Sequence, residues 1–183
     1  MNFEAVFKLL VEKFQSEKID FALIGGFALH ASGLSRATKD IDFIVAEKDI
    51  EKVKKIMFSL GYELIHQSKD VSNYLGKLVE LGKVDFLHAH RKYALAMLKR
   101  ANENTIMQGK FKVRVITAED LIGLKVQSSS NDPKRYNQDM ADIESLIKIN
   151  YNSLDFPLLR EYFALFNREK ELDQILLKVK NAQ

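Results

Sequence analysis

Two aspartates separated by one residue are the feature of this sequence with the clearest chemistry. Asp40 and Asp42 lie in the segment Asp-Ile-Asp-Phe, where apolar residues alternate with the acids. Side chains alternate between faces along a strand, so both carboxylates project from the same side. Adjacent carboxylates repel one another unless a positive charge lies between them, and carboxylate oxygens suit a hard divalent cation such as Mg²⁺. The pair therefore predicts a metal site.

A pair of glycines precedes the aspartates. Gly25 and Gly26 follow the apolar segment 21–24, and Asp40 comes fourteen positions after Gly26. Glycine allows a tight turn and a close approach of the backbone to a ligand, and free N–H groups at the start of a helix favour phosphate. The glycines and the acids together predict a site for a metal and a nucleoside triphosphate.

This arrangement resembles the signature of the polymerase-β-like nucleotidyltransferase superfamily, in which Gly-Gly or Gly-Ser and a spacer precede Asp-x-Asp. The sequence of residues 25–43 is most similar to a small bacterial branch that includes abortive-infection and type IV toxin–antitoxin nucleotidyltransferases. Antibiotic nucleotidyltransferases share the Arg-x-Thr-x-Asp-x-Asp pattern of residues 36–42. Many family members have Ser as the second residue of the pair, whose hydroxyl meets phosphate, whereas Gly26 offers only its N–H.

Nucleotidyl transfer uses two Mg²⁺ ions that contact the attacking and departing oxygens, and three carboxylates usually hold such a pair. Asp85 is the candidate for the third carboxylate, because it lies between Val84 and Phe86 in a predicted strand, where an unpaired charge is costly. In the family resembled here, an acid in this setting helps to deprotonate the acceptor hydroxyl, which implies that role for Asp85. The alternatives are an edge-strand acid that faces water, and Glu80 as the substitute third acid.

Further residues are candidates for phosphate contact. Lys125 falls on an apolar helical stripe, so its charge must reach solvent or meet an anion. Toxin-type relatives have a Lys in such a helix bonded to the triphosphate and an Asp on the next helix. The resemblance implies that Lys125 neutralises phosphate charge and that Asp139 orients Lys125 or the acceptor. The alternative for Asp139 is an ion pair with Arg135, four residues earlier. Arg36 and Lys39, just before the acids, are candidates for the triphosphate or base.

Hydrophobic periodicity predicts an α/β (α+β) fold: a mixed sheet flanked by helices, followed by a helical C-terminal portion. We expect a nucleotidyltransferase-like core over residues 1–116 and a helical portion over 117–183 packed on it. The expected strands lie near residues 21–24, 40–45, 62–66, 72–80, 84–88, 105–107 and 111–116. Besides a short helix after Gly26, the expected helices lie near residues 2–17, 49–60, 93–100, 117–128, 134–149, 155–166 and 168–180.

Composition narrows the function classes. The 183 residues include no Cys, which excludes disulfides and thiolate metal sites. They contain no apolar run of 18 residues and no leader pattern, so we expect a cytoplasmic protein without a membrane partner. The net charge of +3 is modest, but residues 83–114 hold eight Lys and Arg against two acids. A basic segment fits a phosphate-rich acceptor such as RNA, whereas a solvated helix face and hairpin is the alternative.

The hypothesis is a Mg²⁺-dependent nucleotidyltransferase that moves an NMP from an NTP, such as ATP, to a hydroxyl and releases pyrophosphate. The acceptor is an RNA end by preference, with a protein hydroxyl or an aminoglycoside-like antibiotic as alternatives, and the resemblance implies a cognate antitoxin as a partner. One alternative is an inactive nucleotide- or partner-binding module of the same fold. A glycosyltransferase is disfavoured, because only thirty-nine residues precede Asp40.

Overall fold

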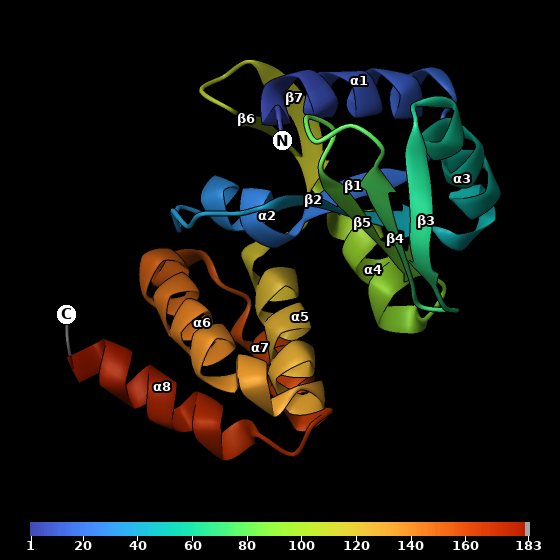
Figure 1. Cartoon of the computed structure of the whole chain (residues 1–183). Helices are drawn as coiled ribbons and strands as arrows, with labels where there is room; N and C mark the ends of the chain where they lie inside the picture. Colours follow the sequence, from blue (N-terminus) through green and yellow to red (C-terminus); the bar gives the residue numbers. More distant parts are fainter. Residues whose placement is uncertain (182–183) are drawn as a thin grey trace. The chain divides into compact units, whose positions relative to one another are not determined.

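The computed structural model describes residues 1–181, which form two compact units. Unit 1 comprises residues 1–31 and 36–116, and unit 2 comprises residues 32–35 together with those from 117 onward. Figure 1 shows a sheet with helices in unit 1 and helices α5 to α8 in unit 2. The predicted fold class, a mixed sheet followed by a helical portion, is confirmed. Residues 182–183 of the predicted helical portion lie outside the described residues, and its packing on the core stays a prediction.

Unit 1 contains one seven-stranded mixed sheet in the order β3-β4-β5-β2-β1-β7-β6. The strands are β1 (Phe21–Ile24), β2 (Asp40–Ala46), β3 (Tyr62–Gln67), β4 (Val71–Gly76), β5 (Lys83–Ala89), β6 (Asn102–Ile106) and β7 (Phe111–Val115). β2 runs parallel to β5, and β1 runs parallel to β7, whereas the other neighbours are antiparallel. The acid-bearing strands β2 and β5 are therefore direct neighbours near the centre of the sheet.

One face of this sheet is an aromatic core. The helices of unit 1 are α1 (Phe3–Ser16), α2 (Gly25–Ala31), α3 (Ile50–Ser59), which follows the 3₁₀ turn Glu47–Asp49, and α4 (Lys92–Arg100). Phe14 of α1 packs edge-on against Phe43 of β2 and Phe86 of β5, with ring centroids 5.6 and 5.9 Å away. Because neighbours along a strand face opposite ways, Asp42 and Asp85 project from the other face.

Unit 2 is built from four helices around an apolar core. They are α5 (Ala118–Asn131), α6 (Tyr136–Asn150), α7 (Phe156–Ala164) and α8 (Glu169–Asn181), with 3₁₀ turns at Pro133–Arg135 and Tyr151–Ser153. Fully buried side chains from all four helices form this core: Ile122, Val126, Ile143, Leu146, Leu159, Phe163 and Leu172. Among residues 1–181, no helix has the length and apolar character that crossing a bilayer requires.

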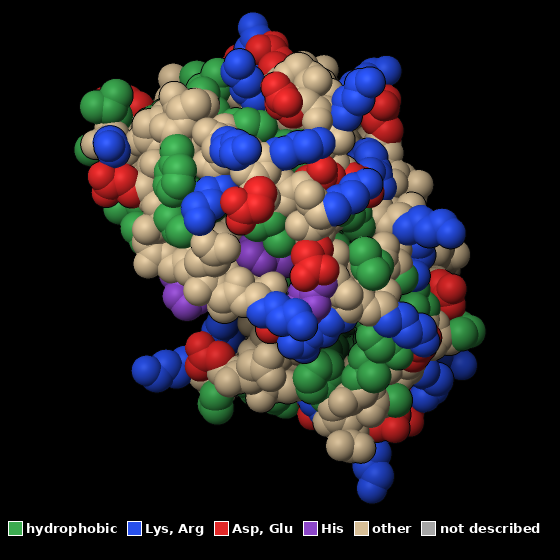
Figure 2. Space-filling model, turned by 90° about the vertical axis from the view of Figure 1, so that its right-hand side faces the viewer, with side chains coloured by type: hydrophobic (Ala, Val, Ile, Leu, Met, Phe, Trp, Pro, Cys, Tyr) green, Lys and Arg blue, Asp and Glu red, His purple; other side chains and the backbone are tan. Residues whose placement is uncertain are grey.

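The basic segment 83–114 is spread over several elements of unit 1 and is largely paired with acids. Its ion pairs join Lys83 to Asp85, Arg91 to Asp70, Lys110 to Glu4, Lys112 to Glu103 and Arg114 to Asp20. On the face of the protein drawn in Figure 2, Lys and Arg side chains are interspersed with Asp and Glu. Five of the eight basic residues thus have local acidic partners among the described residues, which removes much of the charge that would attract RNA.

Candidate active site

Three carboxylates meet on the face of the sheet in unit 1 that lies opposite the aromatic core. Asp40 and Asp42 lie on β2, and Asp85 lies directly opposite Asp42 in the parallel pairing of β2 with β5. One oxygen from each carboxylate lies within 4.8 Å of the other two, and all three side chains are half-buried. The structure thus brings together the three acids that the sequence analysis selected, although Asp85 is distant in sequence from the other two.

Gly25 is required by the position of the Asp42 carboxylate. Ile24, the last residue of β1, pairs with Asp42, so α2 begins directly beside the acid. Gly25 has a positive φ of 62°, and a Cβ atom there would lie 2.0 Å from Oδ2 of Asp42. The backbone N–H of Gly26 donates a hydrogen bond to the Asp42 carboxylate. The glycine turn therefore leaves room for the acid and also orients it.

Thr38 holds the first aspartate in place. Its hydroxyl Oγ1 lies 3.1 Å from both Oδ1 and the carbonyl oxygen of Asp40. Gly26 makes room for Thr38, because a Cβ atom on residue 26 would lie 2.6 Å from Cβ and Oγ1 of Thr38. Sequence analysis assigned no role to Thr38, although the Arg-x-Thr-x-Asp-x-Asp pattern contained the signal.

We expect Thr38→Val, which preserves shape but removes the hydroxyl, to lower nucleotidyl transfer about tenfold while unfolding free energy changes by about 1 kcal/mol or less. The loss follows because Asp40 keeps its position but loses a bond that orients it. Steady-state transfer rates and urea unfolding curves measure the two effects. Thr105→Val, at an exposed position of β6, is the matched control. Equal rates for both variants would contradict a positioning role.

Asp85 is bonded at both of its carboxylate oxygens. Asn73, its cross-strand partner on β4, donates from Nδ2 to Oδ1 at 2.6 Å. Lys83, two residues earlier on β5 and opposite Asp40, donates from Nζ to Oδ2 at 2.5 Å. Sequence analysis missed both partners. The i, i+2 spacing of Lys83 and Asp85 was visible in the sequence, whereas the Asn73 contact depends on strand register.

The electrostatics of the cluster favour a bound cation. Burial, together with the charges of Asp40 and Asp85, raises the pKa of Asp42 from 3.8 to about 7, against smaller opposing effects of Lys83 and the Gly26 N–H. The charged form of the Asp42 carboxylate is therefore unfavourable in these partly desolvated surroundings. The donors are carboxylate oxygens, the ligand type that Mg²⁺ prefers, so the residues present fit a divalent hard cation.

The sequence matches the model of a protein family described as "Uncharacterised nucleotidyltransferase" over residues 2–181. The chain belongs to this nucleotidyltransferase family. The resemblance to nucleotidyltransferases drawn from the Gly-Gly and Asp-x-Asp motifs is thereby confirmed, and the protein is a nucleotidyltransferase. A comparison with curated protein sequences finds no match.

Solved structures of nucleotidyltransferases share the fold of this one. The antibiotic-resistance factor ANT(2'')-Ia is 16% identical with a TM-score of 0.66, and the match covers 95% of this chain and 97% of that one. A nucleotidyltransferase-like protein from Paracoccidioides brasiliensis is 20% identical with a TM-score of 0.60 and coverages of 96% and 92%. The lincosamide antibiotic adenylyltransferase LnuA is 17% identical with a TM-score of 0.55 and coverages of 80% and 97%.

The other candidate residues of the nucleotidyltransferase in unit 1 lie outside the acid cluster. Glu80 is exposed in the loop between β4 and β5, where its carbonyl accepts from the N–H of Asn2, so Asp85 supplies the third carboxylate of the cluster and Glu80 does not. Arg36 is half-buried and Lys39 is exposed in the segment before β2. Contact of Arg36 or Lys39 with the triphosphate stays a prediction.

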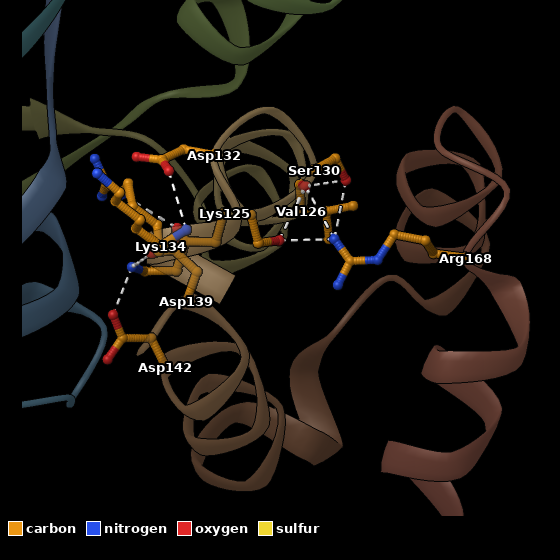
Figure 3. Close-up of polar contacts among 10 residues, drawn as sticks. Lys125, Val126, Ser130, Asp132, Lys134, Asp139, Asp142 and Arg168 are labelled. Atoms are coloured by element: carbon orange, nitrogen blue, oxygen red, sulfur yellow. Dashed lines mark hydrogen bonds and ion pairs between the residues drawn. The ribbon is translucent and has the colours of Figure 1, made fainter. Parts of the chain in front are cut away.

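Lys125 of the nucleotidyltransferase joins two helices of unit 2. Its Nζ lies 3.0 Å from Oδ1 of Asp139 and 2.5 Å from Oδ2 of Asp142, so the ammonium connects α5 to α6 (Figure 3). Arg135 lies 3.4 Å from the other oxygen of Asp139, as the i, i+4 alternative predicted. Burial acts to raise the pKa of Asp139, but Ser128, Lys125 and Arg135 outweigh it and the pKa is lowered.

The phosphate role of Lys125 stays a prediction, and in the described residues its charge is balanced by carboxylates. Asp142 was not among the predicted residues, although it lies one turn after Asp139 and therefore on the same side of α6. A phosphate oxygen would compete with Asp139 and Asp142 for the Lys125 ammonium. The contacts of Lys125 with these two carboxylates support a structural role, in which it joins α5 to α6.

Asp142→Asn is expected to lower the unfolding free energy by about 1–2 kcal/mol, because the Lys125 ammonium then donates to a neutral amide oxygen instead of a carboxylate, while Asp139 still pairs with Lys125. Urea unfolding at pH 7 measures the change. Asp173→Asn removes an exposed pair with Arg160 and should cost about 0.5 kcal/mol or less. Equal effects of the two substitutions would show that the Lys125 cluster contributes no more than a surface ion pair.

Proposed function

We propose that this nucleotidyltransferase moves an NMP from an NTP, such as ATP, to a hydroxyl acceptor, and that Asp40, Asp42 and Asp85 hold Mg²⁺. The observation that carries the proposal is the convergence of three carboxylates within 4.8 Å on one face of the sheet. Two bound Mg²⁺ ions would neutralise the triphosphate and polarise the attacking and departing oxygens. Two ions, rather than one, are part of the proposal.

The chain's own residues position the reacting groups. The acceptor oxygen attacks the α-phosphorus, the bond from that phosphorus to the pyrophosphate oxygen breaks, and pyrophosphate leaves. The proton of the acceptor hydroxyl passes to the Asp85 carboxylate, which lies at the cluster and is only 20% exposed. Gly25 and Gly26 keep the backbone free of side chains beside Asp42, which would allow a phosphate group to approach it.

As the acceptor, we propose a small hydroxylated molecule ahead of an RNA end. The basic segment 83–114, whose charge in the sequence favours RNA, is largely paired with acids in the structure. ANT(2'')-Ia has been solved with adenylyl-2''-tobramycin, and LnuA with lincomycin, so small acceptors are compatible with this fold. Because these proteins are only 15–17% identical to this chain, we do not infer that it uses tobramycin or lincomycin as its acceptor. A protein hydroxyl is a further acceptor for the test, and a cognate antitoxin stays a prediction.

The direct test incubates the protein with each of the four α-labelled NTPs, Mg²⁺ and separate pools of small metabolites, RNA and proteins. We expect label in the small-molecule fraction, release of pyrophosphate, and loss of both with EDTA. Asp42→Asn is the inactive variant, and Asp173→Asn, an exposed aspartate in unit 2, is its control. Label in RNA or protein would replace the proposed acceptor. Absence of label in every pool, or equal label with Asp42→Asn, would overturn the proposed chemistry.

A further inference from the structure

Asn73 and Lys83 form a polar clamp around Asp85. The amide of Asn73 takes Oδ1 and the ammonium of Lys83 takes Oδ2, at 2.6 and 2.5 Å. Both oxygens of the proposed proton acceptor therefore accept hydrogen bonds from side chains of neighbouring residues in the sheet. The Asp85 side chain has little freedom to turn, because a rotation would break one bond or the other.

Strand register places Asn73 on the side of the acids. Asn73 pairs with Asp85 across β4 and β5, and Asp85 pairs with Asp42 across β5 and β2, so the three side chains form one row on the same face. An amide donates a hydrogen bond whether or not a metal ion is bound, since it carries no charge. Asn73 can therefore keep Oδ1 oriented throughout a reaction cycle.

Lys83 brings the opposite charge to the acids. It lies opposite Asp40 in the β2–β5 register and two residues before Asp85, so it shares the face that carries the three carboxylates. Its side chain is 39% exposed, and a lysine ammonium is a single charge on a flexible stem. A divalent cation brings twice that charge to the same oxygens. Cation binding and the Lys83–Asp85 bond are thus in competition.

We propose that Asn73 and Lys83 are positioning residues for Asp85: Asn73 fixes the orientation of its carboxylate, and Lys83 neutralises the acid cluster until a divalent cation displaces its ammonium. The inference rests on the proposed function in treating Asp40, Asp42 and Asp85 as the cation site. Its distinctive consequence is that loss of Lys83 strengthens cation binding, whereas loss of Asn73 weakens it.

The test measures Mn²⁺ affinity by calorimetry and thermal unfolding with and without Mn²⁺ at pH 7.5. Lys83→Met should bind Mn²⁺ about twofold to fivefold more tightly than wild type, a range that matches a partly exposed ion pair. It should also unfold at a lower temperature without metal and recover when Mn²⁺ is added. Lys83→Arg, which keeps the charge, should restore the wild-type affinity.

Asn73→Ala should bind Mn²⁺ more weakly and transfer nucleotide about tenfold to a hundredfold more slowly, because a hydrogen bond to a charged group is lost. The matched controls are Lys112→Met on β7 and Asn104→Ala on β6, both exposed strand positions away from the acids. These controls should match wild type in Mn²⁺ affinity, and circular dichroism should show that all five variants fold.

Unchanged or weaker Mn²⁺ binding by Lys83→Met would overturn the proposed role of Lys83. Unchanged binding and rate in Asn73→Ala would overturn that of Asn73. The proposed function can fail separately. If wild type binds Mn²⁺ and the Lys83→Met and Asn73→Ala variants shift the Mn²⁺ affinity in opposite directions, but wild type labels no acceptor, the proposed clamp would stand and the proposed nucleotidyl transfer would not. Equal Mn²⁺ affinity in wild type and Asp42→Asn would remove the cation site itself, and the clamp with it.

Discussion

Asp42→Asn is expected to lower nucleotidyl transfer by at least about three orders of magnitude and, at pH 8 without metal, to make the protein more stable. The loss of activity follows because Asn is neutral and cannot neutralise a divalent cation as a carboxylate does. The gain in stability follows because the half-buried Asp42 carboxylate is partly desolvated and lies beside two other acids. A residue retained for packing alone would not show these opposite effects.

The pH dependence follows from the direction of the pKa shift. Asp42 titrates near 3.8 in the unfolded chain and at about 7 in the folded one, so folding disfavours its charged form. The unfolding free energy of the metal-free protein therefore decreases as pH rises from about 4 to about 7, by a few kcal/mol at most. Below the unfolded pKa the carboxyl is neutral in both states and this cost is absent.

Urea unfolding with EDTA at pH 5 and at pH 8 measures this dependence, and a radiolabel transfer assay with Mg²⁺ measures activity. The difference in stability between Asp42→Asn and wild type should be larger at pH 8 than at pH 5. Asp173→Asn controls for the loss of a surface charge. A stability difference that is independent of pH would show that Asp42 titrates normally in the folded protein.

Gly25→Ala is the second substitution with a large expected effect. The new Cβ would meet Oδ2 of Asp42 at 2.0 Å and would occupy a residue with a φ of 62°. The Asp42 carboxylate must then move, so we expect transfer to fall at least about a hundredfold. The unfolding free energy should fall by about 1–3 kcal/mol from the backbone strain and the clash.

Gly109→Ala separates the two causes of that loss. Gly109 also has a positive φ, 86°, but a Cβ atom there meets nothing within 4 Å. This variant should lose about 1 kcal/mol from backbone strain and keep full activity. Transfer rates and urea unfolding of both variants are the measurements. If Gly25→Ala kept the activity of Gly109→Ala, the acid cluster would tolerate a displaced Asp42.

Sequence patterns were sufficient to predict the three acids of the cluster, because each acid is recognised from the alternation within its own strand. The alternation in Asp-Ile-Asp-Phe and Val-Asp-Phe gave the faces of Asp40, Asp42 and Asp85, because alternation is a local property of strands. Asn73 and the full contacts of Lys83 were not predictable. They depend on which strands pair and in which register, and single-sequence patterns carry little information about pairing between distant strands.

Two of the predicted element ends that differ from the structure have identifiable causes. The predicted strand 72–80 ends at Gly76, because the Gly76 N–H bonds the Gly82 carbonyl and closes a longer loop. The predicted helix 117–128 continues to Asn131. The hydroxyls of Ser129 and Ser130 donate hydrogen bonds to the Val126 carbonyl. The guanidinium of Arg168 donates to the same carbonyl (Figure 3). Only the second case depends on a distant residue.

The adjacent parallel pairing of β2 and β5 has a consequence for how the site can vary. Backbone hydrogen bonds hold neighbouring strands about 4.8 Å apart, so the gap between Asp42 and Asp85 is set by the ladder and not by the chain that connects them. Added or deleted residues in the loop 77–82 would leave that gap unchanged as long as the ladder is kept. A slip of one residue would instead bring Phe86 opposite Asp42 and turn Asp85 into the aromatic core.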